Sequence, residues 1–153
     1  MNAEYINPFL IAATKILKDT CFIDASIGKP YINNTKFSGD TLVIIIGVTG
    51  EMRGQVMIAF SNSVACDIAS KMIMMPITEL DELSMSAICE LGNMILGNTA
   101  TVFSSKGIGI DITPPTVCMG NVQFTTSYTK NICIPLIYEG DKVIEFNVAM
   151  KGD

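Results

Sequence analysis

The stretch from Asp81 to Ser105 constrains the fold of this chain more than any other part of its sequence. Apolar residues recur around most of a helical circumference along it, so the sequence predicts one long helix. An ordinary surface helix carries a broad charged face opposite its core stripe. Here the polar face is only a narrow strip, so we expect most of this helix to pack against other elements.

The strip combines a hydroxyl, a carboxylate, a carboxamide and a glycine. With Glu90 at zero, Ser86 lies at about −40°, Asn93 at about −60° and Gly97 at about −20° around the helix axis. Glu90 and Asn93 can stand side by side, while Ser86 and Gly97 add no bulk beside them. The strip is therefore a candidate contact surface for another molecule. Glu and Asn are nevertheless common on helix surfaces, and Gly92 and Gly97 would also suit tight helix packing.

Cap and turn signals divide the remaining chain into short elements. Asn7 as N-cap and Pro8 at the first helical position predict a helix that continues to about Lys18. The serines at 61 and 63 predict the start of another helix, which ends near Met74 before a proline. The predicted strands are 21–31 (irregular), 41–48, 55–60, 108–113, 122–138 with a bend near 130–131, and 142–150, with hairpin turns at 49–54 and 139–141.

The predicted element order is α-βββ-αα-βββ, which indicates an α+β fold. Because hairpins dominate, we expect a largely antiparallel sheet with the helices packed on one face. Each set of strands follows a helix or helix pair, which hints at a duplicated unit. No linker, charge block or low-complexity tract divides the sequence, so we expect residues 1–153 to form a single domain.

Composition excludes several classes of function. Ten basic against fifteen acidic residues give a formal charge of −5, which argues against nucleic acid as a partner. The chain has no histidine, which excludes Ser-His-Asp and Cys-His catalysis and histidine zinc sites. The glycines at 107 and 109 lack the full nucleotide-binding fingerprint and follow a predicted helix.

We expect a cytoplasmic protein with no membrane segment. The most apolar run, 42–48, has the length of a strand, and the N-terminus lacks the features of a signal peptide. Five scattered cysteines without a CxxC pair indicate reduced thiols. A zinc site built from four of them is the less favoured alternative, because structural zinc sites usually use closely spaced pairs.

The polar strip also matches a family motif. Ser86-x3-Glu90-x2-Asn93-x21-Pro115 resembles, in order and spacing, the motif of the CheC/CheX/FliY family of chemotaxis phosphatases. The opening 4–9, EYINPF, looks specifically like the CheX branch. The resemblance implies a CheC/CheX-like fold and a phosphatase that removes the phosphoryl group from the phosphoaspartate of a CheY-like receiver domain.

The same resemblance implies a role for each motif residue. Asn93 would position the attacking water, and Glu90 would dock against the lysine of the receiver's active site. Ser86 and Gly97 would contact the partner, and Pro115 would shape a loop. No metal or cofactor of its own is implied, because the receiver would hold the magnesium ion. A homodimer is implied as well, for which we favour the late strands as the contact.

Two other functions stay open on the sequence alone. One is a non-catalytic adaptor related to motor-switch proteins that binds receivers, and the other is a purely structural dimerisation module. A near-repeat of the motif, Glu4-x2-Asn7-x22-Pro30, is one residue longer. Because we expect Asn7 to be a cap residue, we expect only one site per chain.

Overall fold

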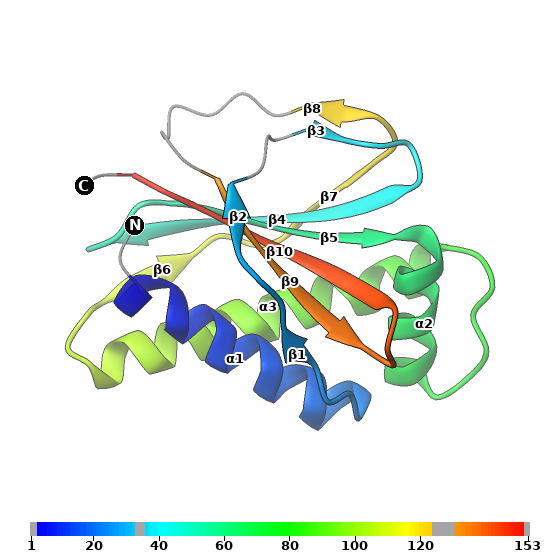
Figure 1. Cartoon of the computed structure of the whole chain (residues 1–153), viewed down its shortest axis with the longest axis horizontal. Coiled ribbons are helices and arrows are strands. Elements are labelled where there is room, and N and C mark those ends of the chain that lie inside the picture. The colour runs from blue at the N-terminus through cyan, green and yellow to red at the C-terminus, as the bar shows by residue number, and fades with distance from the viewer. Residues whose placement is uncertain (1–2, 33–35, 124–130, 152–153) are drawn as a thin grey trace.

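The computed structural model describes residues 3–32, 36–123 and 131–151. The helices are α1 (Ala3–Cys21), α2 (Asn62–Ile73) and α3 (Glu82–Ser105) (Figure 1). The strands are β1 (Ser26–Ile27), β2 (Tyr31–Ile32), β3 (Lys36–Phe37), β4 (Thr41–Gly50), β5 (Gly54–Ser61), β6 (Ile110–Ile112), β7 (Thr116–Met119), β8 (Val122–Gln123), β9 (Ile132–Tyr138) and β10 (Lys142–Met150). Among these segments, no helix has the length and apolarity needed to cross a bilayer.

The main sheet has the order β1-β9-β10-β5-β4-β6, and every pairing in it is antiparallel. β2 pairs with β9 beside β1, and β7 pairs with β4 beside β6. The helices lie against one face of the sheet, while β3 and β8 form a small separate ladder on the other side (Figure 1). The expected α+β fold with an antiparallel sheet and helices on one face is therefore confirmed.

Most of the core lies between the sheet and the helices. Phe9 of α1 packs edge-on against Phe103 of α3, with ring centroids 5.6 Å apart, and lies 6.2 Å from the ring of Phe146 in β10. A smaller apolar cluster around Phe37 and Met57 fills the other face of the sheet. All five cysteines are free thiols.

The local signals for the later helices are confirmed. Ser61 caps α2 by accepting a hydrogen bond from the N–H of Val64, and Met74 ends that helix in the left-handed conformation.

The hairpin of β9 and β10 turns through Glu139 and Gly140, both at positive φ, as a tight hairpin turn requires.

The expected start of the first helix is wrong. α1 begins at Ala3, which places Asn7 and Pro8 inside the helix. Tyr5 and Ile6 pack partly against the main core, so apolar burial extends the helix upstream of the proline. Pro8 is tolerated there because its fixed φ suits a helix and only one hydrogen bond near the first turn is lost.

The strand expected at 122–138 is confirmed at its two ends, β8 (Val122–Gln123) and β9 (Ile132–Tyr138), which belong to different sheets. Residues 124–130 of it lie outside the described residues, and Asn131, at the expected bend, is not part of a strand. β7 at 116–119 was not predicted at all. Its pairing partner, β4, lies far away in the sequence, so no local pattern marks it.

The strand pairing is nearly the same at the two edges of the sheet. β4 pairs with β6 and β7 at one edge, and β9 pairs with β1 and β2 at the other. Ile27 pairs with Leu136 of β9, and Tyr31 pairs with Cys133. The segment 28–30 therefore has one residue more than the facing part of β9, residues 134–135. This is a β-bulge, and a matching bulge on the opposite side shapes the candidate site.

Candidate active site

The start of α3 is fixed by a reciprocal cap. The Ser84 N–H donates to the Asp81 carboxylate over 2.8 Å, and the Asp81 N–H donates to the Ser84 hydroxyl over 2.7 Å. The hydrogen bonds that the Ser84 N–H and the Ser84 hydroxyl donate to the carboxylate lower the pKa of the Asp81 carboxyl. The cap sets where α3 begins, and so which residues each turn presents to the core.

The packed face of α3 explains one of its two glycines. Gly92 lies against β4, where an added β-carbon would stand only 3.1 Å from Cγ2 of Ile44 and 3.4 Å from Cδ1 of Ile46. At Gly97 an added β-carbon would meet nothing within 4 Å. Gly92 therefore serves close packing of the helix on the sheet, and Gly97 does not.

The opposite face of α3 presents the predicted strip. The side chains of Ser86, Glu90 and Asn93 are exposed, and Gly97 is half-buried. Among the described residues, neither the Glu90 carboxylate nor the Asn93 amide has a hydrogen bond or ion pair, so both are available to another molecule.

A bulge brings a proline up to this strip. Val48 of β4 pairs with Ile112, and Ile45 pairs with Thr116, so residues 113–115 contain one residue more than the facing part of β4. Such a bulge interrupts the ladder and turns a side chain in a new direction. β6 and β7 are thus two parts of one strand, separated by the bulge.

Thr113 ties the bulge to the sheet. Its hydroxyl accepts a hydrogen bond from the N–H of Gly47 over 2.8 Å, and its own N–H donates to the Gly47 carbonyl over 3.0 Å. An added β-carbon on Gly47 would stand 3.0 Å from Cγ2 of Thr113, so a glycine allows this close approach. These two hydrogen bonds between Thr113 and Gly47 hold the following Pro114 and Pro115 in place.

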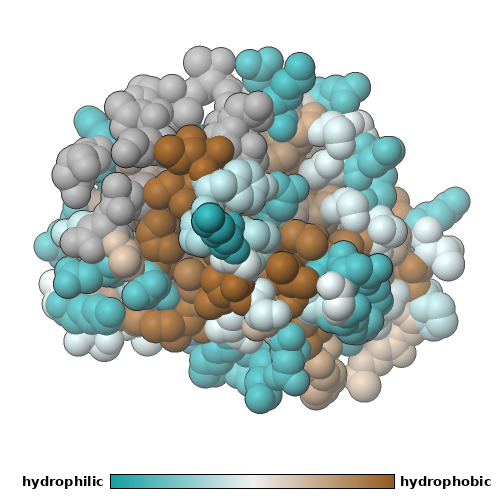
Figure 2. All heavy atoms as spheres, viewed as in Figure 1, coloured by the Kyte–Doolittle hydropathy of each residue, from teal (hydrophilic) through white to brown (hydrophobic). Residues whose placement is uncertain are grey.

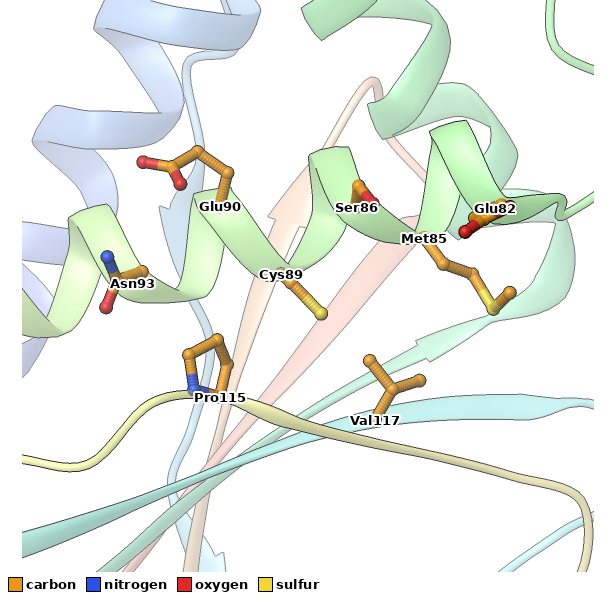
Figure 3. Close-up of a pocket in the computed structure, with 8 residues that line it drawn as sticks. All are labelled: Glu82, Met85, Ser86, Cys89, Glu90, Asn93, Pro115 and Val117. Atoms are coloured by element: carbon orange, nitrogen blue, oxygen red, sulfur yellow. The ribbon is translucent and has the colours of Figure 1, made fainter.

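An open cavity of about 390 Å³ lies between α3 and this edge of the sheet. Figure 3 shows Asn93 above Pro115, Glu90 pointing away from β7, and Met85 and Cys89 pointing toward it. The cavity is lined by Glu82, Met85, Ser86, Cys89, Glu90, Asn93, Pro115 and Val117. The structure therefore brings together the motif residues at 86, 90, 93 and 115, while Gly97 lies on the strip outside the lining.

The cavity wall supplies little covalent or metal chemistry. Burial raises the pKa of the Cys89 thiol, which stays protonated at neutral pH and is a weak nucleophile. Within the described ranges, no three His, Cys, Asp or Glu residues gather in a way that could hold a metal ion. The wall offers a ligand the carboxylates of Glu82 and Glu90, the Ser86 hydroxyl and the Asn93 carboxamide, so it can orient groups by hydrogen bonding and charge.

Four residues of the lining were not among the predicted site residues. Met85 and Cys89 flank the strip on the helical wheel, and Glu82 falls at about −80° when Glu90 is zero, so the wheel held a signal for all three. The sequence analysis held no such signal for Val117, because its strand, β7, was not predicted.

The near-repeat of the motif lies on α1. Glu4 and Asn7 are both exposed, and Asn7 is a helical residue, so the reason given for rejecting this pair is wrong. α1 nevertheless differs from α3 in the turn that follows. Seven residues after Glu4 stands Ile11, which is 51% exposed, whereas the residue at the same distance from Glu90 is Gly97. The bulky side chain makes the α1 surface less open to a partner.

Comparison with known proteins identifies relatives over the whole chain. Residues 42–137 match the family model "Chemotaxis phosphatase CheX". The chain is 31% identical to the CheY-P phosphatase CheX of Thermotoga maritima, over 99% of both chains.

Solved structures agree with this assignment. CheX in a CheX–CheY–BeF₃–Mg²⁺ complex from Borrelia burgdorferi superposes with a TM-score of 0.84 at 29% identity, covering 97% of this chain and 98% of that one. A CheC-like superfamily protein from Shewanella sp. PV-4 gives a TM-score of 0.87 at 26% identity, covering 99% and 100%. The sequence match and the shared fold together show that this chain belongs to the CheX family of chemotaxis phosphatases.

Proposed function

We propose that this chain hydrolyses the phosphoaspartate of a CheY-like receiver domain. One observation carries the proposal: Glu90 and Asn93 stand exposed on the wall of an open cavity that Pro115 also lines, and neither has a partner among the described residues. The family membership adds the substrate class, because the Thermotoga relative is named a CheY-P phosphatase.

Asn93 positions the attacking water in this proposal. The water oxygen forms a bond to phosphorus as the bond from phosphorus to the aspartate oxygen breaks, and inorganic phosphate and a free carboxylate result. A carboxamide suits this task because it can accept a hydrogen bond from the water through Oδ1 and donate one through Nδ2. Its contribution is the alignment of one solvent molecule with the breaking bond.

Glu90 holds the receiver in place. Its carboxylate pairs with the lysine of the receiver's active site and brings Asn93 to the phosphoryl group. The magnesium ion that neutralises phosphoryl charge belongs to the receiver, and Mg²⁺ is part of the Borrelia CheX–CheY complex. Ser86 and Gly97 lie along the same strip and contact the receiver surface, and Pro115 bounds the cavity below Asn93.

The experiment measures phosphate release from a phosphorylated CheY-like receiver with Mg²⁺ present. We expect Asn93→Ala to lower the accelerated rate by about 100-fold or more, as loss of one precisely placed polar group commonly does. Binding to the receiver is expected to stay close to that of the wild type. Asn98→Ala is the matched control, because Asn98 lies on the same helix but does not line the cavity.

Glu90→Ala separates docking from water positioning. We expect it to weaken association as well as turnover, measured as a higher KM together with a lower kcat. If both variants keep the wild-type rate, the assignment of the site is wrong. A wild-type protein that binds the receiver without shortening the lifetime of its phosphate would instead support the adaptor function.

We further propose that residues 1–153 act as one cytoplasmic phosphatase domain and form a homodimer through the late strands. The outer face and edge near β9 and β10 expose several apolar side chains: Ile27, Tyr31, Ile32 and Val143. Figure 2 shows apolar surface on this side of the molecule, where β1 and β2 lie in front of the sheet in Figure 1. A mass corresponding to one 16.5 kDa chain at micromolar concentration would contradict the dimer.

A further inference from the structure

The cavity extends beyond the residues that the proposed chemistry uses. From Asn93 and Glu90 it continues along α3 toward the start of the helix, as far as Glu82. Glu82 precedes Glu90 by about two helical turns, which corresponds to about 12 Å along the axis. Between the two carboxylates, Met85 and Cys89 point toward Val117 and give the cavity an apolar floor (Figure 3).

The Glu82 carboxylate has no partner among the described residues. It is exposed, whereas the neighbouring Asp81 carboxylate is engaged as the cap of α3. A carboxylate in the first turn of a helix gains a modest favourable interaction with the helix dipole. The interaction with the helix dipole does not require Glu82 to lie on the cavity wall. It persists when a ligand pairs with the Glu82 carboxylate.

The lining carries negative charge only. Glu82 lies at one end of it and Glu90 lies toward the other end, beside Asn93, and no lysine or arginine lines it. A complementary occupant would therefore present two cationic groups about 12 Å apart, with an apolar side chain between them. Such spacing can distinguish between partners, because a like-charged group at either end would be repelled.

We propose that Glu82 is a specificity-determining residue, which pairs with a lysine or arginine of the receiver outside its active site. An apolar side chain of the receiver lies on Met85 and Val117 at the same time. This inference rests on the proposed function, because it takes the phosphorylated receiver as the occupant and Glu90 as the partner of its catalytic lysine. It adds a second contact that selects the receiver and takes no part in the hydrolysis.

The test compares steady-state phosphate release by the wild type, Glu82→Gln and Glu82→Lys with the same phosphorylated receiver. We expect Glu82→Gln to raise KM by about threefold to tenfold, and Glu82→Lys to raise it further. kcat is expected to stay within about twofold, because Asn93 and Glu90 are unchanged. At about 1 M ionic strength the Debye length is about 3 Å, so the difference in KM between the wild type and Glu82→Gln is expected to shrink.

Asp141→Lys is the matched control for net charge. Asp141 is exposed in the turn between β9 and β10 and does not line the cavity. It changes the total charge as Glu82→Lys does, so it reports the general effect of charge on association. Thermal melting of each variant checks that the fold is intact, and Glu82→Gln keeps the test valid if the lysine variant does not fold.

The possible results separate this inference from the proposed function. A wild type that does not accelerate phosphate release overturns both, since no receiver is then a substrate. An active wild type with an unchanged KM in Glu82→Gln overturns only the role of Glu82. The same holds if Asp141→Lys raises KM as much as Glu82→Lys does, or if kcat falls while KM is unchanged. A lysine-to-glutamate change on the receiver that restores binding to Glu82→Lys supports the inference directly.

Discussion

Replacing Gly97 with alanine tests whether this glycine is present for a partner or for the fold. Alanine is favoured over glycine in a helix interior by about 1 kcal/mol. Because an added β-carbon at Gly97 meets nothing within 4 Å, no packing cost opposes that gain. For a domain of this size, about 1 kcal/mol corresponds to a rise in Tm of about 2 to 4 °C.

Gly92→Ala is the matched comparison within the same helix. It has the same gain in helix propensity, but its methyl group would stand 3.1 Å from Ile44, which is fully buried. Crowding a well-packed core typically costs about 1 to 3 kcal/mol. We therefore expect Gly92→Ala to lie at or below the wild-type Tm, and Gly97→Ala to lie above it.

The activity of Gly97→Ala decides the role of the residue. If the receiver lies on the strip, the new methyl group obstructs it, and KM for the phosphorylated receiver rises severalfold although the protein is more stable. The measurements are thermal melts by circular dichroism at one protein concentration, and phosphate release against receiver concentration. A Tm below that of the wild type would refute the stability argument, and an unchanged KM would refute the contact at Gly97.

Two further predictions concern the elements around the site. Thr113→Val leaves the Gly47 N–H without its 2.8 Å partner, so we expect lower stability and a lower kcat as Pro115 shifts, whereas Thr113→Ser keeps the hydroxyl and is expected to retain both. Burial opposes ionisation of Asp67, but hydrogen bonds from the Tyr138 hydroxyl and from Lys71 hold the pKa of its carboxyl below the ordinary value. A lowered folded-state pKa contributes stability above the unfolded value of about 3.9, and this contribution is lost as pH falls through the folded value. We therefore expect Asp67→Asn to have a lower Tm at neutral pH and a weaker loss of Tm on acidification below about pH 4, measured by thermal melts across pH.

Sequence patterns identified the parts of the site that depend on local structure. The start of α3 at Asp81 and the phase of its polar strip follow from capping and from a period of 3.6 residues, which are properties of adjacent residues. The cap of α2 at Ser61 was found in the same way. These features place Glu90 and Asn93 on one exposed face without knowledge of the remaining fold.

The parts that depend on distant pairing could not be read from the sequence. β7 has no local signal, and the bulge before it exists only relative to the register of β4. Val117 was therefore missed, and the motif match could select Pro115 over Pro114 but could not place it beneath Asn93. The prediction of where α1 begins was wrong for a related reason. Burial of Tyr5 and Ile6 against the core outweighs the capping signal of Asn7.

The near-symmetry of the sheet allows a last test, of whether α1 is a second site. Glu4 and Asn7 are exposed at the same spacing as Glu90 and Asn93. The exposed Ile11 nevertheless stands where α3 has Gly97, and a receiver lying along the α1 surface would meet this side chain. We therefore expect Asn7→Ala to leave phosphate release unchanged, and Asn7→Ala combined with Asn93→Ala to be no slower than Asn93→Ala alone. A residual rate in Asn93→Ala that disappears only in the double variant would show that α1 also hydrolyses the receiver, and that bulk at Ile11 is no barrier to its approach.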